Sequence, residues 1–205
     1  MTINNERKIL ESFLHNKKLK FSEIENLLRI RSNKLSYHLK RMVKNDLLKK
    51  EGDNYLLSKK TEMLIPYLSE KKAVLPVVVI MIKQKGEVFL VEREKRPFKG
   101  KLALPAGRII LGERIQESVT RIMKEKYFIN AEIKKTCSLS LEQVKDEGKI
   151  VHSFMLILVI AKTKDKLVYS DPKKLKNRII KSDYELIIND SKKNLKIKEF
   201  NTKDL

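Results

Sequence analysis

Cysteine is almost absent from this chain of 205 residues, which has only Cys137. A single thiol excludes an internal disulfide and any zinc site built on several cysteines. We expect Cys137 to be a small buried strand residue. Histidine is also scarce, and neither His15 nor His152 has acidic or cysteine neighbours at metal-ligand spacing. We therefore assign no metal and no other cofactor from these residue types.

Long hydrophobic runs are missing as well. The two longest apolar runs, "AVLPVVVIMI" (residues 73–82) and "FMLILVIA", fall well short of the ~20 residues that a membrane-spanning helix needs. The N-terminal segment "MTINNERKIL" is polar and has no signal-peptide pattern. We expect a soluble, cytoplasmic protein without a membrane partner.

Positive charge is abundant, with 46 Lys and Arg against 26 Asp and Glu and a net charge of +20. Such a surface suits a polyanionic partner such as DNA, but lysine-rich composition also marks proteins from hot environments. Because the basic residues are spread over both halves of the chain, charge alone decides little. The 41% of apolar residues is enough for a buried core and argues against disorder.

The sequence pattern changes near residue 73, which predicts a domain of residues 1–72 and another of residues 73–205. The first segment has three helical stretches and then "LLKKEGDNYLLS", a hairpin pattern. In the third helical stretch Ser32 is the expected N-cap, and Leu35, Leu39, Met42 and Val43 form an apolar stripe. Three helices followed by a basic hairpin are the plan of a winged helix-turn-helix. A further helix is expected at residues 61–72, with an interruption near Pro66.

Residues 21–58 resemble the winged-helix regulators of the ArsR/MarR type, in which the segment "SYHL" would belong to the recognition helix. The face opposite the apolar stripe carries groups that reach phosphates or base edges. The predicted DNA contacts are Asn33, Tyr37, Lys40, Arg41 and Lys44 on this helix, and Lys49 and Lys50 in the hairpin. The alternative is an ordinary solvated face. His38, at the edge of the stripe, is expected to pack in the core.

Strands dominate the second segment. "VLPVVVIMIKQKGEVFLVERE" predicts a hairpin, residues 112–129 predict a helix, and "AEIKKTCSLSLEQV" and "KIVHSFMLILVIAKT" predict two more strands. The tail "NLKIKEFNTKDL" is expected to give one further strand and the start of a helix. This order indicates an α+β arrangement.

Residues 104–129, "LPAGRIILGERIQESVTRIMKEKYFI", resemble the Nudix family, whose box is G-x5-E-x7-R-E-U-x-E-E-x-G-U, with U an aliphatic residue. Gly107, Glu113 and Arg121 match the front half in type and spacing. The resemblance extends from about Val77 to the C-terminus. It implies an α/β/α sandwich with a mixed sheet following the winged helix-turn-helix.

The back half of the box departs from the family pattern. Two of the three expected carboxylates are replaced, by Ile122 and Lys126, and only Glu125 remains. In the family these carboxylates hold Mg²⁺ or Mn²⁺, and an ammonium at that position would repel a dication. We expect Glu117 and Glu125 to pair with Arg121 as helix salt bridges. Acids outside the box are also candidates for catalysis: Glu142, Asp146 and Glu147.

A site without a metal can still bind phosphate through cations and a helix N-terminus. The predicted ligand-binding residues are Arg93, Lys101, Gly107, Arg108, Arg121 and Lys126. Our leading interpretation is a homodimeric, DNA-binding transcriptional regulator whose disarmed Nudix-like domain senses a nucleotide-like phosphate ligand or supports dimerisation, with no catalytic residue. The alternative is a Nudix hydrolase of nucleoside diphosphate derivatives that uses carboxylates outside the box. A third possibility is an assembly platform.

Overall fold

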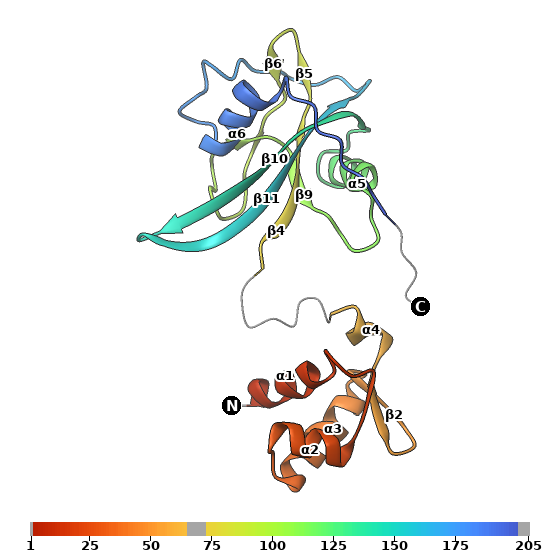
Figure 1. Cartoon of the computed structure of the whole chain (residues 1–205). Helices are drawn as coiled ribbons and strands as arrows, with labels where there is room; N and C mark the ends of the chain where they lie inside the picture. The colour runs from red at the N-terminus through yellow and green to blue at the C-terminus, as the bar shows by residue number, and fades with distance from the viewer. Residues whose placement is uncertain (1, 65–72, 201–205) are drawn as a thin grey trace. The chain divides into compact units, whose positions relative to one another are not determined.

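The computed structural model describes residues 2–64 and 73–200 (Figure 1). The chain divides into two compact units, Met1–Ala73 and Val74–Leu205, and each has a hydrophobic core of its own. Within the described ranges, no helix is both long and apolar enough to cross a membrane.

The first unit packs helices against a small antiparallel sheet with the strand order β1-β3-β2. Its core is built from all of these elements, with Ile9, Ile24 and Leu39 fully buried. The predicted hairpin is confirmed as β2 and β3, whereas β1 was not foreseen. The elements are α1 (Thr2–Ser12), β1 (Lys18–Lys20), α2 (Phe21–Leu28), α3 (Ser32–Lys44), β2 (Leu48–Glu51), β3 (Asn54–Leu57) and α4 (Lys59–Glu62).

Helix α3 shows how far its apolar stripe reaches. Leu35, Leu39 and Met42 are fully buried, but Val43 is 36% exposed, because it lies at the edge of the stripe. His38 is buried, which confirms it as a packing residue. Ser32 is not the N-cap: the helix begins at Ser32 itself, and the Ser32 hydroxyl donates to the carboxylate of Glu25 instead. The helix expected over residues 61–72 lies largely outside the described residues; α4 already ends at Glu62.

The second unit is built on a four-stranded mixed sheet with the order β10-β11-β4-β9, in which only β11 and β4 are parallel (Figure 1). The mixed sheet expected for this part of the chain is confirmed. Its main strands are β4 (Leu75–Met81), β9 (Ala106–Arg108), β10 (Glu132–Asp146) and β11 (Lys149–Lys162). Smaller hairpin strands are β5 (Lys83–Gln84), β6 (Glu87–Val88), β7 (Val91–Glu92) and β8 (Leu102–Ala103).

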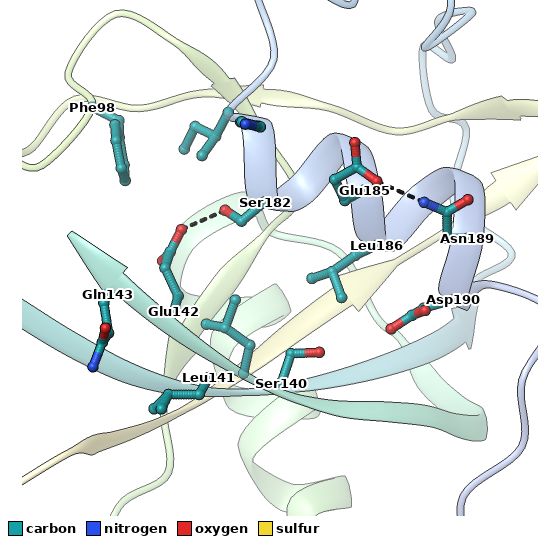
Figure 2. A pocket seen from close by; sticks show the side chains of 13 residues that line it. Phe98, Ser140, Leu141, Glu142, Gln143, Ser182, Glu185, Leu186, Asn189 and Asp190 are labelled. Carbon is teal, nitrogen blue, oxygen red and sulfur yellow. Dashed lines mark hydrogen bonds between the residues drawn. The ribbon is translucent and has the colours of Figure 1, made fainter. Parts of the chain in front are cut away.

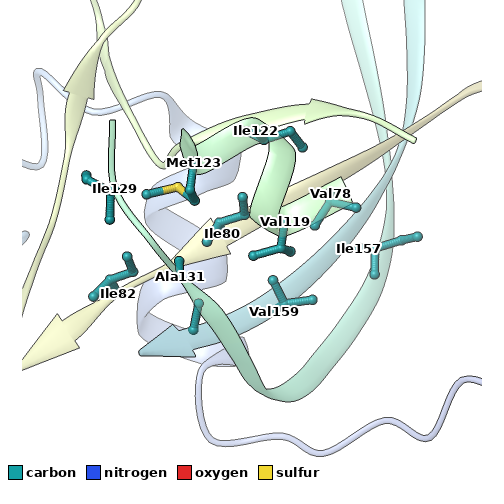
Figure 3. Packing of buried hydrophobic residues seen from close by; sticks show 11 residues of the cluster. Val78, Ile80, Ile82, Val119, Ile122, Met123, Ile129, Ala131, Ile157 and Val159 are labelled. Carbon is teal, nitrogen blue, oxygen red and sulfur yellow. The ribbon is translucent and has the colours of Figure 1, made fainter. Parts of the chain in front are cut away.

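Each face of this sheet is covered by a helical segment. Helix α5 (Ile115–Tyr127) covers one face, and α6 (Lys181–Glu185) with the π-helical turn η2 (Leu186–Asp190) covers the other. Strand β4 contributes buried side chains to both faces of the sheet. Val78 and Ile80 pack on the α5 side, whereas Val79 and Met81 pack on the η2 side. Figure 3 shows the α5 side, where Val119, Ile122 and Met123 pack on the sheet.

One expectation about the C-terminal part is wrong. Residues 193–200 form no strand, although their apolar pattern alternates. A single backbone hydrogen bond, from the Leu195 amide to the Thr136 carbonyl at 3.0 Å, joins this segment to β10. One such bond is too few for the segment to pair with β10 as a strand. The sequence pattern also gave no signal for α6 and η2. The expected start of a helix at residues 201–205 lies outside the described part.

Cys137 lies on β10 and is 2% exposed, as expected for a small buried strand residue. Its sulfur approaches the Ser191 carbonyl at 3.9 Å, and burial raises the pKa of the thiol. The thiol is therefore a packing group that ties the sheet to the segment after η2.

Candidate active site

Strand β9 approaches the middle of α5 very closely at Gly107. A Cβ atom added to Gly107 would lie 2.7 Å from both Cγ1 and Cδ1 of Ile122. No side chain fits in that gap unless the isoleucine shifts. Gly107 is therefore required for close packing of the box strand on the box helix, and Ile122 is part of the core.

Arg121 fixes the loop between β9 and α5. Its Nη2 donates to Glu113 Oε2 and to the Arg108 carbonyl, both at 2.9 Å, and its Nε also donates to Glu113. This pairing, together with the Ser118 hydroxyl and the Ile110 amide, lowers the pKa of Glu113 to about 2. Glu113 and Arg121, which match the front half of the box, thus hold the loop in place.

The salt bridges predicted along α5 are only partly correct. Glu125 approaches Arg121 at 3.8 Å, but Glu117 accepts the Arg114 amide at 2.7 Å at the start of the helix. Glu117 is an N3 residue in a first turn whose amides lack helical partners, so it binds the backbone there. Arg121 pairs with Glu113 instead, and it does not line any cavity described below.

Lys126 lies where the box would have a carboxylate. Its Nζ donates to the Ala106 carbonyl at 2.7 Å. The residue as a whole is exposed, and its ammonium group lies against the β9 backbone. Desolvation of the ammonium there, followed by the positive charges of Arg121 and Arg93, lowers the pKa of Lys126.

The box residues do not fit a divalent cation. Ile122 is fully buried, Lys126 brings a positive charge, and the Glu125 side chain is 65% exposed beside Arg121. Hard dications need several oxygen ligands that converge. In the described ranges there is no group of three or more His, Cys, Asp or Glu side chains that could hold a metal ion.

A cavity of about 340 Å³ opens beside the box strand, between β9, β4 and β11. Four of the predicted ligand-binding residues line it: Arg93, Gly107, Arg108 and Lys126. Other cationic and aromatic side chains in its wall are Lys95, Arg96, Phe98, His152 and Phe154. A concave site with several cations is suited to an anionic ligand.

Two carboxylates from outside the box face the same cavity, Glu142 on β10 and Asp183 on α6. The Ser182 hydroxyl donates to Glu142, and the Leu104 amide donates to Asp183 Oδ2 at 2.7 Å. Burial, reinforced by the negative charge of Glu142, raises the pKa of Asp183 to about 7. A buried acid that titrates near neutrality in a cleft is typical of catalytic groups.

Of the three acids considered from the sequence, only Glu142 is in the site. Asp146 and Glu147 lie at the β10–β11 turn and line none of the cavities described here. Sequence reasoning missed Asp183, because a lone aspartate in "IIKSDYELI" has no motif around it. The sequence offers one cue to Asp183, the apolar pair Ile179 and Ile180 shortly before it, and both of these residues are buried in the structure.

A second cavity, of about 580 Å³, adjoins the first and shares Phe98, Glu142 and Ser182 with it. Figure 2 shows it between β10 and the α6–η2 segment, with the Ser182–Glu142 and Asn189–Glu185 hydrogen bonds along its wall. The cations of the first cavity are absent from this lining, in which Lys181 is the one cationic residue among those described. The combined cleft is therefore cationic at one end and neutral or acidic at the other.

The remaining predicted ligand residues are placed as follows. Arg93 is anchored by a bond from its Nε to the Pro97 carbonyl at 2.9 Å, with its side chain at the cavity wall. Lys101 is outside the cavity, because its Nζ donates to the Asn177 carbonyl at 3.0 Å. The structure therefore does not bring Lys101 or Arg121 together with the residues that line the cavity.

The basic residues of the first unit are mostly solvated. Asn33, Tyr37, Lys40, Lys44, Lys49 and Lys50 are exposed. Arg41 is not free on that face, because its Nε lies 2.8 Å from Glu6 Oε1 and its side chain is half-buried. Lys50 lies over the Tyr55 ring, 5.8 Å from the ring centre.

Comparison with known proteins assigns the family. The model of the NUDIX domain matches residues 72–176, about half of the chain, and the chain therefore belongs to the NUDIX domain family. The ADP-ribose pyrophosphatase of Methanocaldococcus jannaschii is 31% identical over 85 residues, which cover 40% of this chain and 50% of that protein. This chain thus spans about half the length of that relative.

Solved structures also resemble the chain. The MutT protein from Methanosarcina mazei Go1 matches with a TM-score of 0.46 at 20% identity, over 61% of this chain and 100% of that one. A NUDIX hydrolase from Nitrosomonas europaea matches with a TM-score of 0.45 at 17% identity, over 52% and 78%. Because both TM-scores lie below 0.5, the family assignment rests on the sequence match.

These findings correct the leading functional prediction. A DNA-binding transcriptional regulator is contradicted by the NUDIX domain match and by the pyrophosphatase relative, which favour the hydrolase alternative. The prediction gave too much weight to a charged helix face, which solvation and the Arg41–Glu6 ion pair explain equally well. It also gave too little weight to acids outside the box, although Glu142, which was named among them, lies in the cleft together with Asp183.

Proposed function

We propose that this protein hydrolyses the phosphoanhydride bond of a nucleoside diphosphate derivative of the ADP-ribose class. One observation carries the proposal: a single cavity combines Arg93, Arg108 and Lys126 with Asp183, an acid that titrates near pH 7. The cations suit the diphosphate, and the acid suits proton transfer at neutral pH. The ADP-ribose pyrophosphatase relative supports the choice of substrate class.

Asp183 would act as the general base. Its carboxylate takes a proton from a water molecule while the water oxygen forms a bond to phosphorus. The bridging P–O bond breaks, and the electron pair leaves with the departing phosphate group. Arg93, Arg108 and Lys126 offset the charge that develops on the phosphate oxygens. Burial keeps the pKa of Asp183 high, and the negative charge of Glu142, which accepts from the Ser182 hydroxyl, adds to this effect.

Aromatic side chains in the same cleft support a nucleoside ligand. The rings of His152 and Phe154 are stacked, 5.9 Å apart and inclined by 24°. Phe98 is 38% exposed, and it lines both cavities. A base can stack on such surfaces, and the neighbouring second cavity offers hydroxyl and amide groups to a sugar.

The test is a panel of nucleoside diphosphate derivatives, including ADP-ribose, with the products identified by ³¹P NMR. We expect AMP and ribose phosphate from ADP-ribose at a rate on the order of 1 s⁻¹. Asp183→Asn keeps an acceptor for the Leu104 amide but cannot take the proton, so its turnover should fall by about 10²-fold or more. Asp146→Asn, outside the cavities, is the matched control. Equal turnover by both variants would remove Asp183 from the mechanism.

For the first unit we propose a winged helix-turn-helix fold only, with no function attached. The order of α1, α2 and α3 before the β2–β3 hairpin supports it, as does β1 pairing with β3.

A further inference from the structure

Two cations of α5 hold the backbone of the box strand. Lys126 Nζ donates to the Ala106 carbonyl at 2.7 Å, and Arg121 Nη2 donates to the Arg108 carbonyl at 2.9 Å. Gly107 lies between these two carbonyls and packs against Ile122. The junction of β9 and α5 is therefore filled by positive charge and by an apolar side chain.

This arrangement opposes a divalent cation at the junction. The Ala106 carbonyl oxygen, a hard ligand of the kind Mg²⁺ takes, already accepts from the ammonium. A dication placed next to it would be repelled by Lys126 and by Arg121. Glu125 is drawn toward Arg121 and is mostly exposed.

The same ammonium is well placed for phosphate. Lys126 and Arg93 both line the cavity described above, and they also line the adjoining cavity next to Tyr127. An ammonium has three donors, and among the described residues Lys126 uses one, on Ala106. Desolvation strengthens the remaining charge-assisted bonds that it can make.

We propose that Lys126, with Arg93, takes the place of a divalent cation in this site, so that the diphosphate group binds as its metal-free anion. The inference rests on the proposed function for the identity of the ligand. It goes further in assigning the ammonium the role that a metal has in an acidic box, namely charge neutralisation at the diphosphate.

The experiment is calorimetric titration of the full chain with the methylene-bridged analogue of ADP-ribose, whose P–C–P bridge cannot be hydrolysed, in EDTA and, separately, with Mg²⁺. We expect binding in EDTA, with a dissociation constant that Mg²⁺ leaves unchanged. Lys126→Met removes the charge while preserving the side-chain length, and it should weaken metal-free binding by about tenfold or more, the loss of one charged hydrogen bond. Lys124→Met, on the same helix but outside the cavities, should bind as the wild type does.

The outcomes separate this inference from the proposed function. Metal-free binding without any turnover would support the role of Lys126 and remove the hydrolase proposal. Turnover that disappears in EDTA and returns with Mg²⁺ would overturn the inference and leave the hydrolase standing. Equal binding by the Lys126→Met and Lys124→Met variants would also overturn it, and so would an absence of binding in both buffers.

Discussion

At the scale of single residues, this chain has Ile122, Lys126 and Phe128 where the Nudix box has two glutamates and a glycine, and each replacement has its own structural role. Ile122 becomes part of the core, Lys126 binds a backbone carbonyl, and Phe128 ends the helix. Ile122 also shows why restoring a glutamate there would be costly: its carboxylate would enter the core beside Gly107. The replacements are therefore coupled to the packing around them.

Phe128 provides a residue-scale prediction. It is the C-cap of α5 with φ 58°, in the left-handed region, and its ring is 88% exposed. A side chain with a Cβ costs about 1–2 kcal/mol there, and glycine avoids that cost. Phe128→Gly should therefore raise the free energy of unfolding by about 1 kcal/mol in urea titrations. Phe128→Ala, which keeps the Cβ, is the control; equal stability of the two variants would show that the backbone is not strained.

At the scale of elements, the packing of β9 on α5 determines the geometry of the cleft. Gly107 permits that contact, and Arg121 with Glu113 holds the loop between them. Because β9 supplies the carbonyl that anchors Lys126, a shift of this strand would move the cationic wall of the cavity.

Gly107→Ala tests this contact. The added methyl group would lie 2.7 Å from Ile122, so strand and helix must separate, at a cost of about 1–3 kcal/mol in unfolding free energy. Ile122→Ala in the same chain removes the clashing atoms, and the double variant should lose less stability than the sum of the two single changes. Strict additivity in thermal or urea unfolding would mean that the two residues do not contact each other.

The elements also show what the sequence could predict. The helical pattern of residues 112–129 predicted α5, and the runs "AEIKKTCSLSLEQV" and "KIVHSFMLILVIAKT" predicted β10 and β11; all three are confirmed. Strand β4 reads as a buried run because both of its faces are covered. The strand predicted for the C-terminal segment does not form. Alternating apolar residues give a strand only where a neighbouring strand offers a series of backbone hydrogen bonds, and here the Leu195 amide makes a single one to β10.

At the scale of the whole molecule, the cleft is assembled from segments far apart in the chain. Arg93, Gly107 and Lys126 are near the box, but Glu142 and Asp183 come from β10 and α6. Local pattern therefore identified the cationic wall and one acid, and it could not identify Asp183, whose environment arises only when α6 packs beside β10. The family domain and the N-terminal unit are each compact, and the functional proposal concerns the second unit alone.

The pH dependence of kcat/KM for ADP-ribose tests the central claim most directly, because this ratio reports the protonation of the free enzyme. A base with a pKa of about 7 is protonated and inactive at lower pH. We predict that kcat/KM falls about tenfold per pH unit below about pH 7 and is level above it. Glu142→Gln removes a negative charge that raises this pKa, so its profile should move to lower pH. A wild-type profile without an inflection near neutrality, or an unchanged profile in Glu142→Gln, would contradict the account.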